Sequence, residues 1–402
     1  MADKADKNNA NRKAHPRSGV YRQQPTGYRA FVPKNLPLKP QIDVASLEPR
    51  LSRATLALGR LDGIADLVPN PDLFVAMYVR KEAVLSSQIE GTQASLSDVL
   101  AYESGVPESA HGGPADVSEV YNYVRALNHG LDRLPDLPLS LRLLKEIHSV
   151  LMEGVRGGDK QPGEFRRSQN WLGPEGCTIE DATFIPPPWQ DLQQHLGNLE
   201  AFIRKEDNLP TLIRCGVAHA QFEMIHPFLD GNGRLGRLLI TLMLSEREVL
   251  SRPLLYLSAY FTSRKAEYYA WLTRVREEGD WEGWLSFYLD GVREVAAEAV
   301  STAKAVLDLQ RVHLDLVRSK IGERSLAPRL LERLSLQPII TVRIASGLID
   351  ASIPTTNNLV GKFEQLGLLQ EITGQNRNRV FRYQPYLDLL SGTSKKPSAA
   401  QR

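Results

Sequence analysis

Apolar residues recur at steps of three and four along the chain between residues 43 and 318, which is the spacing expected of helices that bury one face. Long examples begin at Ala45 and Asp72, and further helical stretches continue to residue 317. Strand signals in this region are sparse. The single candidate hairpin starts at Asn170, in NWLGPEGCTIEDATFIPPP, where Gly and Pro separate β-branched and aromatic residues. The pattern therefore predicts a mainly α domain with one small β-hairpin.

The pattern changes on both sides of this region. Residues 1–20 are charged and rich in Asn, lack the apolar segment of a secretory signal, and predict a disordered tail. The Pro-rich stretch PTGYRAFVPKNLPLKPQI predicts an extended arm. Beyond residue 318, three short helical stretches precede two strands around a Gly-Gln-Asn turn, which is the order of a winged helix. The predicted units are a tail (1–20), an arm with helices (21–110), a helical core (111–318), a winged-helix domain (319–390) and a second tail (391–402).

The composition is that of an ordinary globular protein. The 402 residues suffice for two or three domains, and 42% are hydrophobic and 24% charged. A formal net charge of +2 gives no global indication of nucleic-acid or membrane binding, and no apolar run approaches the ~20 residues of a membrane helix. Cys177 and Cys215 lie in segments of different character, so we expect neither a disulfide framework nor a cysteine zinc site. A reducing compartment, the cytoplasm, fits best.

The stretch HPFLDGNGRLGR, from His226 to Arg237, interrupts the apolar helical pattern with charged and polar groups. One helix should end near Ile225, because Pro227 disfavours helical geometry in the residue before it. A second helix should begin within the glycine-rich part, whose glycines allow backbone conformations closed to other residues. A glycine-rich loop that leads into a helix N-terminus presents unpaired N–H groups and a positive dipole end. The stretch therefore predicts an anion site.

The charged side chains of this stretch narrow the kind of anion. Arg234 and Arg237 lie three residues apart, and two arginines beside free amides suit a polyphosphate better than a single carboxylate. Asp230 offers a hard oxygen ligand for Mg²⁺, and His226 could act as a general base. Each feature alone is also typical of a capped helix end or a simple turn. Together they favour a site, because two arginines at a helix N-terminus need a compensating anion.

The same stretch matches every defined position of the pattern H-x-F-x-[DE]-G-N-G-R-x-x-R, and so resembles the Fic-domain protein adenylyltransferases. Members of this family are helical proteins that transfer AMP from ATP to a hydroxyl side chain of a protein. The resemblance implies that His226 activates a Tyr, Ser or Thr hydroxyl, that Phe228 packs the loop onto the core, and that Asp230 holds Mg²⁺. It assigns phosphate binding to Gly231, Asn232, Gly233, Arg234 and Arg237. A kinase-like relative has lysine at the position of Gly233, so the glycine favours AMP transfer.

A second motif, SSQIEG, lies in a helical pattern upstream, and Gly91 predicts the end of that helix. Glu90 would then be an anion at the negative end of a helix, which is unfavourable by about 0.3–1 kcal/mol without a cation. Alone, it is typical of a solvated glutamate. The family carries an inhibitory helix with the pattern [ST]-x-x-x-E-[GN], which Ser86, Glu90 and Gly91 match. The resemblance implies that Glu90 pairs with Arg237 in the place of the ATP γ-phosphate and leaves ATP poorly aligned.

The resemblance extends to two further segments. Thr183, Phe184 and Ile185 match the centre of a flap that positions the target hydroxyl as an added strand, although the stretch is also typical of a Pro-stiffened loop. Tyr268 matches a position that lines the nucleobase pocket, although aromatic residues at helical spacing are more often core. Arg276 stands where some members have asparagine. The implied fold is a Fic-type helical core with a small β-hairpin flap and a C-terminal winged-helix (α+β) domain.

Three functions stay open. The first is Mg²⁺-dependent transfer of AMP from ATP to a protein hydroxyl, or to the protein itself, with Glu90 as inhibitor. The second is removal of AMP from a modified protein by the same residues. The third is a nucleotide-sensing regulator that binds DNA through the winged helix. Residues 338–384 hold five basic and three acidic residues, a weak bias that also fits a protein-docking or homodimer-forming module.

Overall fold

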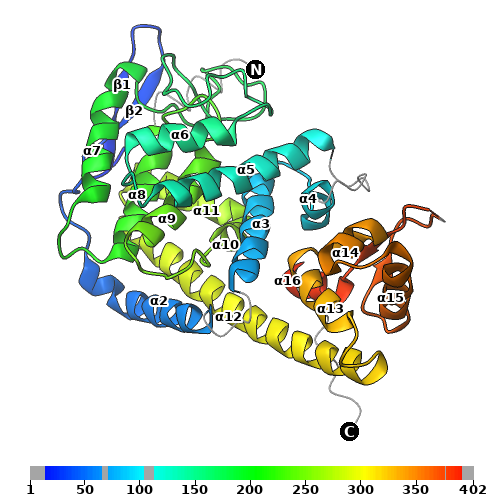
Figure 1. The fold of residues 1–402 in the computed structure, drawn as a ribbon. Coiled ribbons are helices and arrows are strands. Elements are labelled where there is room, and N and C mark those ends of the chain that lie inside the picture. Colours follow the sequence, from blue (N-terminus) through cyan, green and yellow to red (C-terminus); the bar gives the residue numbers. More distant parts are fainter. Residues whose placement is uncertain (1–13, 66–70, 104–112, 376, 392–402) are drawn as a thin grey trace.

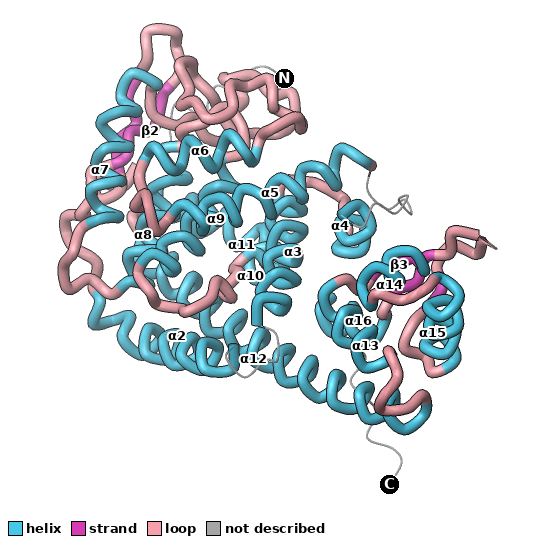
Figure 2. Tube along the Cα trace, viewed as in Figure 1, coloured by secondary structure: helices cyan, strands magenta, loops and turns pink. Residues whose placement is uncertain are grey.

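The computed structural model describes residues 14–65, 71–103, 113–375 and 377–391, and these are mostly helical (Figures 1 and 2). Eleven α-helices precede the C-terminal unit within the described residues: α2 (Val44–Ala65), α3 (Pro71–Ile89), α4 (Leu96–Glu103), α5 (Pro114–Arg133), α6 (Leu141–Leu151), α7 (Leu192–Arg204), α8 (Thr211–Ile225), α9 (Asn232–Glu246), α10 (Ser258–Ser263), α11 (Lys265–Glu278) and α12 (Trp281–Lys320). No helix in this described part combines the length and apolar character needed to cross a membrane.

Helices α8 and α9 form the centre of the larger unit, and the 40-residue α12 runs from beneath them toward the C-terminal unit (Figure 1). Nearly every residue of α8 is buried, as expected of a helix surrounded by others. The close contact between α8 and α12 depends on Gly216, where a Cβ would lie 2.7 Å from Leu285. The Trp284 indole donates a hydrogen bond to the Gly216 carbonyl at 2.9 Å. Helix α8 of the central pair is therefore packed closely against α12.

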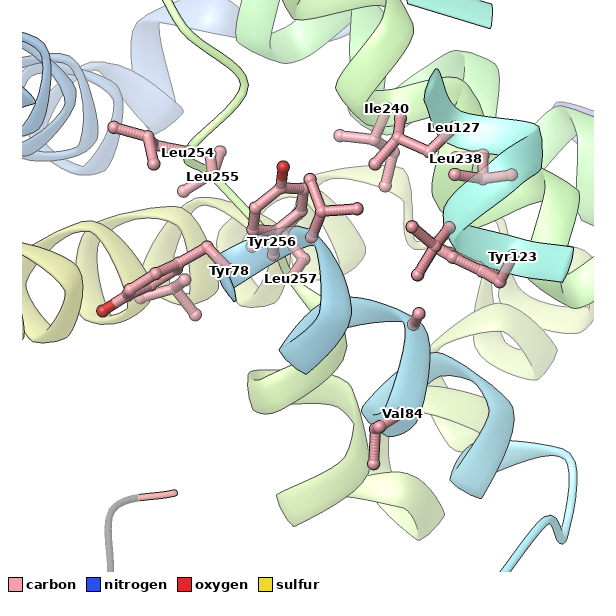
Figure 3. Close-up of a cluster of buried hydrophobic side chains, with 14 of the residues drawn as sticks. Tyr78, Val84, Tyr123, Leu127, Leu238, Ile240, Leu254, Leu255, Tyr256 and Leu257 are labelled. Atoms are coloured by element: carbon pink, nitrogen blue, oxygen red, sulfur yellow. The ribbon is translucent and has the colours of Figure 1, made fainter. Parts of the chain in front are cut away.

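Helices α3, α5 and α9 contribute side chains to the same buried core, part of which is drawn in Figure 3. Tyr78 and Val84 come from α3, Tyr123 from α5, and Leu238 and Ile240 from α9. All five side chains are buried. This packing fixes α3 against the beginning of α9, so the loop that follows α3 has a defined position relative to the predicted anion site.

The N-terminal region differs from the prediction. Strands β1 (Gly19–Gln23) and β2 (Arg29–Pro33) form an antiparallel hairpin where we expected a tail followed by an extended arm. Ser18 is buried, and its hydroxyl donates to the Val275 carbonyl at 2.5 Å. The β-branched and aromatic residues on either side of the Pro-Thr-Gly turn were a usable hairpin signal. The predicted tail is therefore wrong for residues 14–20, while residues 1–13 and 392–402 lie outside the described part.

The predicted hairpin at residues 170–188 is an irregular loop. Within the described residues, its strand pairing is limited to one isolated antiparallel bridge between Leu172 and Phe184. Three consecutive prolines follow Ile185, and proline cannot donate to a strand ladder. The sequence also gave no indication of the short helices α4 and α10, which have eight and six residues. Such lengths show too few turns for a period to be recognised.

The C-terminal unit contains the three predicted helices and two predicted strands in the predicted order, with one strand and one helix more. Its elements are α13 (Ala327–Leu336), β3 (Ile339–Thr341), α14 (Val342–Ile349), α15 (Ile353–Gln365), β4 (Gln370–Glu371), β5 (Val380–Arg382) and α16 (Gln384–Ser391). The antiparallel sheet has the order β3–β5–β4. Helix α16 packs against α3 and α12 (Figure 1).

Candidate functional site

The loop between α8 and α9 has the backbone that its sequence predicts. Helix α8 ends at Ile225 and α9 begins at Asn232, as expected from the proline and the glycines. His226 caps α8 in the left-handed conformation, with φ 49° and ψ 63°, and Gly231 precedes α9 with φ 74°. A left-handed non-glycine residue is sparsely populated and persists only where its surroundings hold it. The conformation of His226 is therefore imposed by its neighbours.

Several side chains lock the loop from within. The amide side chain of Asn232 donates to the Phe228 carbonyl at 2.8 Å and accepts from the Phe228 N–H at 2.9 Å. Phe228 is fully buried and stacks on His148, with ring centroids 3.8 Å apart. The Gly163 N–H donates to Nδ1 of His148, so Nε2 carries the proton and donates to the Asp230 carbonyl at 3.0 Å. Burial lowers the pKa of His148 to about 4, which keeps this ring neutral.

The N-terminus of α9 is the predicted anion site. The first N–H groups of a helix have no partner within the helix, and the dipole there is positive. Because the Asn232 amide side chain is used inside the loop, main-chain N–H groups remain for an anion. A Cβ at Gly233 would lie 2.4 Å from Oε1 of Glu90 and 3.1 Å from Nη1 of Arg237. A side chain at this position would displace the Glu90 carboxylate, which lies directly over this helix start.

Glu90 and Arg237, 147 residues apart in the chain, form an ion pair. Nη2 of Arg237 donates to Oε1 of Glu90 at 2.7 Å, and Nε donates to the Ser86 hydroxyl, also at 2.7 Å. Nη2 also donates to the Ser86 carbonyl at 3.0 Å. Burial would raise the pKa of Glu90, but the Arg237 guanidinium outweighs it and the pKa is lowered. Gly91 follows with φ 104°, just past the end of α3 at Ile89.

Arg234 has a different environment from Arg237. Its guanidinium lies 3.5 Å from Oε2 of Glu119, 3.5 Å from the Met152 sulfur and 3.8 Å from Oδ1 of Asp230. Glu119 is itself buried and also pairs with the exposed Arg156 at 3.3 Å. A paired arginine at a helix start satisfies its charge without a ligand. The two arginines therefore diverge, Arg234 toward α5 and Arg237 toward α3.

His226 lies beside a second titratable group. Its Nδ1 is 4.0 Å from Oε2 of Glu223, one turn earlier in α8. Burial is the main reason that the pKa of His226 is lowered to about 4, and the Arg166 guanidinium lowers it further. Burial raises the pKa of Glu223 to about 7. The imidazole is therefore neutral near pH 7 and can accept a proton.

Asp230 is the candidate metal ligand. About a third of its side chain is exposed, its Oδ1 accepts from the Gly231 N–H at 2.7 Å, and its Oδ2 lies 3.1 Å from Nζ of Lys160. Across the part of the chain that the structure describes, no group of three or more His, Cys, Asp and Glu side chains could hold a metal ion. Mg²⁺ commonly takes one or two protein carboxylates and completes its shell with phosphate and water oxygens. This single carboxylate, at the rim of the anion site, fits that requirement.

The flap segment is already bonded on both of its edges. Phe184 exchanges hydrogen bonds with Leu172, at 2.8 and 3.1 Å, and the Ile185 carbonyl accepts from the Phe31 N–H of β2 at 2.9 Å. The guanidinium of Arg276 lies 4.3 Å from the centre of the Phe184 ring. Thr183 donates its hydroxyl to the Leu172 carbonyl. Strand addition at Phe184 or Ile185 would therefore require one of these partners to leave.

Tyr268 belongs to an aromatic core. It is 1% exposed, and its hydroxyl lies 2.9 Å from Nε2 of His219, whose Nδ1 is 2.8 Å from the Gly236 carbonyl. The Tyr268 ring also stacks on Phe261 at 4.4 Å. These contacts differ from the predicted lining of an open pocket. Its neighbour Tyr269 is 41% exposed and presents the accessible ring on this part of α11.

Residues that the sequence did not single out form a buried network behind Arg237. The carboxylate of Glu82 accepts from the Ser258 hydroxyl at 2.5 Å, from the Ser258 N–H at 3.2 Å and from the Tyr123 hydroxyl at 3.1 Å. Glu82 and Ser86 lie one turn apart on the same face of α3, where Ser86 contacts Arg237 of α9 and Glu82 contacts α5 and α10. The sequence signal that could have indicated this network is an acidic residue on the apolar face of a helical pattern, as at Glu82 and Glu119.

The Glu82 network predicts a pH-dependent stability. Burial raises the pKa of Glu82 from 4.5 to about 7, so the folded protein binds this proton more tightly than the unfolded chain. Its contribution to stability is complete below pH 4.5 and is lost as the pH rises through 7. We expect Glu82→Gln to lose less unfolding free energy than the wild type between about pH 5 and 8, by ~1.4 kcal/mol per unit of pKa difference. Urea unfolding at both pH values measures this.

The matched control for this test is Glu332→Gln, because Glu332 is an exposed residue of α13. The control should follow the wild-type pH dependence. Equal slopes for Glu82→Gln and the wild type would contradict a protonated Glu82 in the folded state.

The helical fold and the loop from His226 to Arg237 define a class: a helical protein in which a glycine-containing loop leads into a helix N-terminus beside two buried arginines. The chain matches the Fic/DOC family N-terminal model over residues 49–132 and the Fic/DOC family model over residues 138–244. Residues 49–132 and 138–244 therefore carry the two domains of the Fic/DOC family.

Curated relatives share part of the chain. A probable protein adenylyltransferase of Aquifex aeolicus is 27% identical over 180 residues, which are 44% of this chain and 51% of the relative. The protein adenylyltransferase Fic of Drosophila erecta is 27% identical over 190 residues, 47% of this chain and 34% of that protein. The match thus spans about half of the first relative and a third of the second. A crystal structure of a Fic family protein from Desulfovibrio desulfuricans, 20% identical, covers 88% of this chain and 98% of its own with a TM-score of 0.53, which supports the shared fold.

Proposed function

We propose that this protein transfers AMP from ATP to a hydroxyl group of a protein, and that Glu90 inhibits this transfer. The observation that carries the proposal is the arrangement around α9. A neutral imidazole precedes a helix N-terminus with a buried arginine, and that arginine is engaged by an acidic residue from another helix. Relatives named protein adenylyltransferase add support.

In the proposed reaction, the target hydroxyl oxygen attacks the α-phosphorus of ATP. A bond forms between that oxygen and the phosphorus, the bond from the α-phosphorus to the bridging oxygen breaks, and pyrophosphate leaves. His226 accepts the hydroxyl proton on its neutral imidazole. The N–H groups at the start of α9 bind phosphate oxygens, and Arg237 binds the γ-phosphate once Glu90 releases it. Mg²⁺ held by Asp230 would neutralise phosphate charge.

The Glu90 carboxylate opposes this reaction in two ways. It takes the hydrogen bond of Arg237 that would go to the γ-phosphate, and its negative charge lies over Gly233 where phosphate would bind. ATP bound beside it would be misaligned for in-line attack, and alignment supplies much of the catalysis of phosphoryl-type transfer. We further propose that the exposed Tyr269, in place of the buried Tyr268, contacts the nucleobase.

The C-terminal unit is proposed to be a winged helix that docks a macromolecule. The support is its order of helices and strands and the antiparallel sheet β3–β5–β4. Ile353, at the start of α15, is 49% exposed, and Ser352 caps this helix by accepting from the Thr355 N–H. The exposed start of α15 is where such domains contact a partner.

The proposal is tested by finding out which phosphate of ATP becomes attached to protein. We expect the Glu90→Gly variant with Mg²⁺ to incorporate label into itself or a target protein from ATP labelled at the α-phosphate. We expect no incorporation from ATP labelled at the γ-phosphate, because pyrophosphate carries that atom away. Gel autoradiography measures both. Label from the γ-phosphate alone would overturn AMP transfer in favour of phosphate transfer.

A further inference from the structure

Arg166 is a buried arginine without a carboxylate partner. Its side chain is 2% exposed and lies in the loop between α6 and the flap. Every hydrogen bond that its guanidinium donates ends on a main-chain carbonyl, and no ion pair engages it within the described part of the chain. Burying a cation without an anionic partner is costly. The four carbonyl acceptors offset this cost, and together they fix the position of the guanidinium.

The carbonyls bound by Arg166 belong to segments whose relative positions matter for the proposed reaction. Nε donates to the carbonyl of His226 at 3.0 Å, and Nη2 donates to Pro187, at the end of the flap, at 2.5 Å and to Ile225, the last residue of α8, at 3.4 Å. Nη1 donates to Ser168 at 3.2 Å. One guanidinium thus joins the end of α8, the His226 backbone and the flap.

The main-chain N–H of Arg166 and the side chain of Asn170 also bond to the loop that contains His226. The N–H of Arg166 donates to the Pro227 carbonyl at 2.9 Å. Nδ2 of Asn170 donates to the His226 carbonyl at 3.3 Å and to the Phe228 carbonyl at 2.8 Å. The His226 carbonyl is therefore held from two sides. These contacts account for the left-handed backbone at His226, which is held by hydrogen bonds from the segment that precedes the flap.

We propose that Arg166 is a positioning residue, which fixes the His226 imidazole relative to the flap that presents the target hydroxyl. Arginine suits the task because its planar guanidinium offers five N–H donors in fixed directions, whereas lysine offers three on a flexible stem. Arg166 makes none of its hydrogen bonds to α9, so phosphate binding should be independent of it. This inference rests on the proposed AMP transfer.

The test compares Arg166→Gln and Arg166→Lys in the full chain carrying Glu90→Gly. Two quantities are measured with Mg²⁺ present: the dissociation constant of ATP, by calorimetry, and the rate of α-phosphate label transfer at saturating ATP. We expect Arg166→Gln to lower the saturating rate about 100-fold, since a misplacement of ~1 Å can cost that much. The ATP dissociation constant should stay within about threefold, and Arg166→Lys should recover part of the rate. Arg167→Gln, at the exposed neighbouring position, should match its parent.

Several results would overturn the inference. One is a saturating rate for Arg166→Gln equal to that of Arg167→Gln. Another is a loss of ATP affinity that accounts for the whole loss of rate. If Arg166→Gln does not fold, Asn170→Ala decides, because it removes one of the two side-chain donors to the same carbonyl. It should show the same pattern with a smaller decrease, and a parental rate would overturn the inference. Failure of the Glu90→Gly parent to transfer label would instead refute the proposed function.

Discussion

Replacing Glu90 with glycine is expected to increase the rate of α-phosphate label transfer about 100-fold over the wild type. The variant removes the carboxylate that lies 2.7 Å from Nη2 of Arg237 and over the start of α9. Arg237 then becomes available to the γ-phosphate, and ATP can bind with its α-phosphate in line with the target hydroxyl. Glycine creates no clash at this position because it only removes side-chain atoms, and Glu90 lies in a turn outside α3. Initial rates of labelling with Mg²⁺ and saturating ATP measure the effect.

The size-matched control for this prediction is Glu90→Gln. Glutamine keeps the size of the side chain and loses the negative charge, so it should activate less than glycine and more than the control Glu332→Gln. Equal labelling by wild type and Glu90→Gly would contradict the inhibitory contact, whatever the rate. Since the ion pair spans α3 and the start of α9, activation should come without a change in the fold, and circular dichroism checks this.

Replacing His226 with alanine in the Glu90→Gly chain is expected to reduce label transfer by about 10²–10⁴-fold, the usual contribution of a positioned general base. The imidazole is the neutral base beside the anion site, because burial lowers its pKa to about 4. The phosphate-binding groups belong to α9, so the affinity for ATP should change little. Single-turnover labelling measures the rate, and calorimetry measures the affinity.

His129→Ala is the matched control, since His129 lies on α5 and pairs with Glu146 at 3.6 Å. The control should label at the rate of its parent. A His226→Ala variant that labelled as fast as this control would remove His226 from the reaction and leave another group as the base.

Local sequence was sufficient for the backbone of the candidate site. Pro227 and the glycines of the loop end α8 and start α9 where predicted, because each limits the backbone of its own residue or its neighbour. The pairing of Glu90 with Arg237 was inferred from a family motif, and the structure places them together through the packing of α3 against α9. Helical periodicity alone gives no information on which two helices touch.

Other positions depended on burial, which decides the role of a side chain. Tyr268 has the spacing of either a core or a pocket residue, and its contacts with His219 and Phe261 place it in the core. The flap carries one isolated bridge, to Leu172, and its other edge is bonded to Phe31 of a hairpin that the sequence pattern did not predict. Both outcomes depend on segments far away in the chain.

The sequence by itself determined the helical class, the limits of the helices around the loop and the identity of the groups that a phosphate could meet, since these depend on local periodicity and backbone preference. Only the tertiary structure decided that Arg234 pairs with Glu119, that Glu90 lies over Gly233, and that Arg166 holds the His226 carbonyl. Each of these contacts joins elements separated by tens of residues. Their geometry is set by how whole helices pack, which no local pattern encodes.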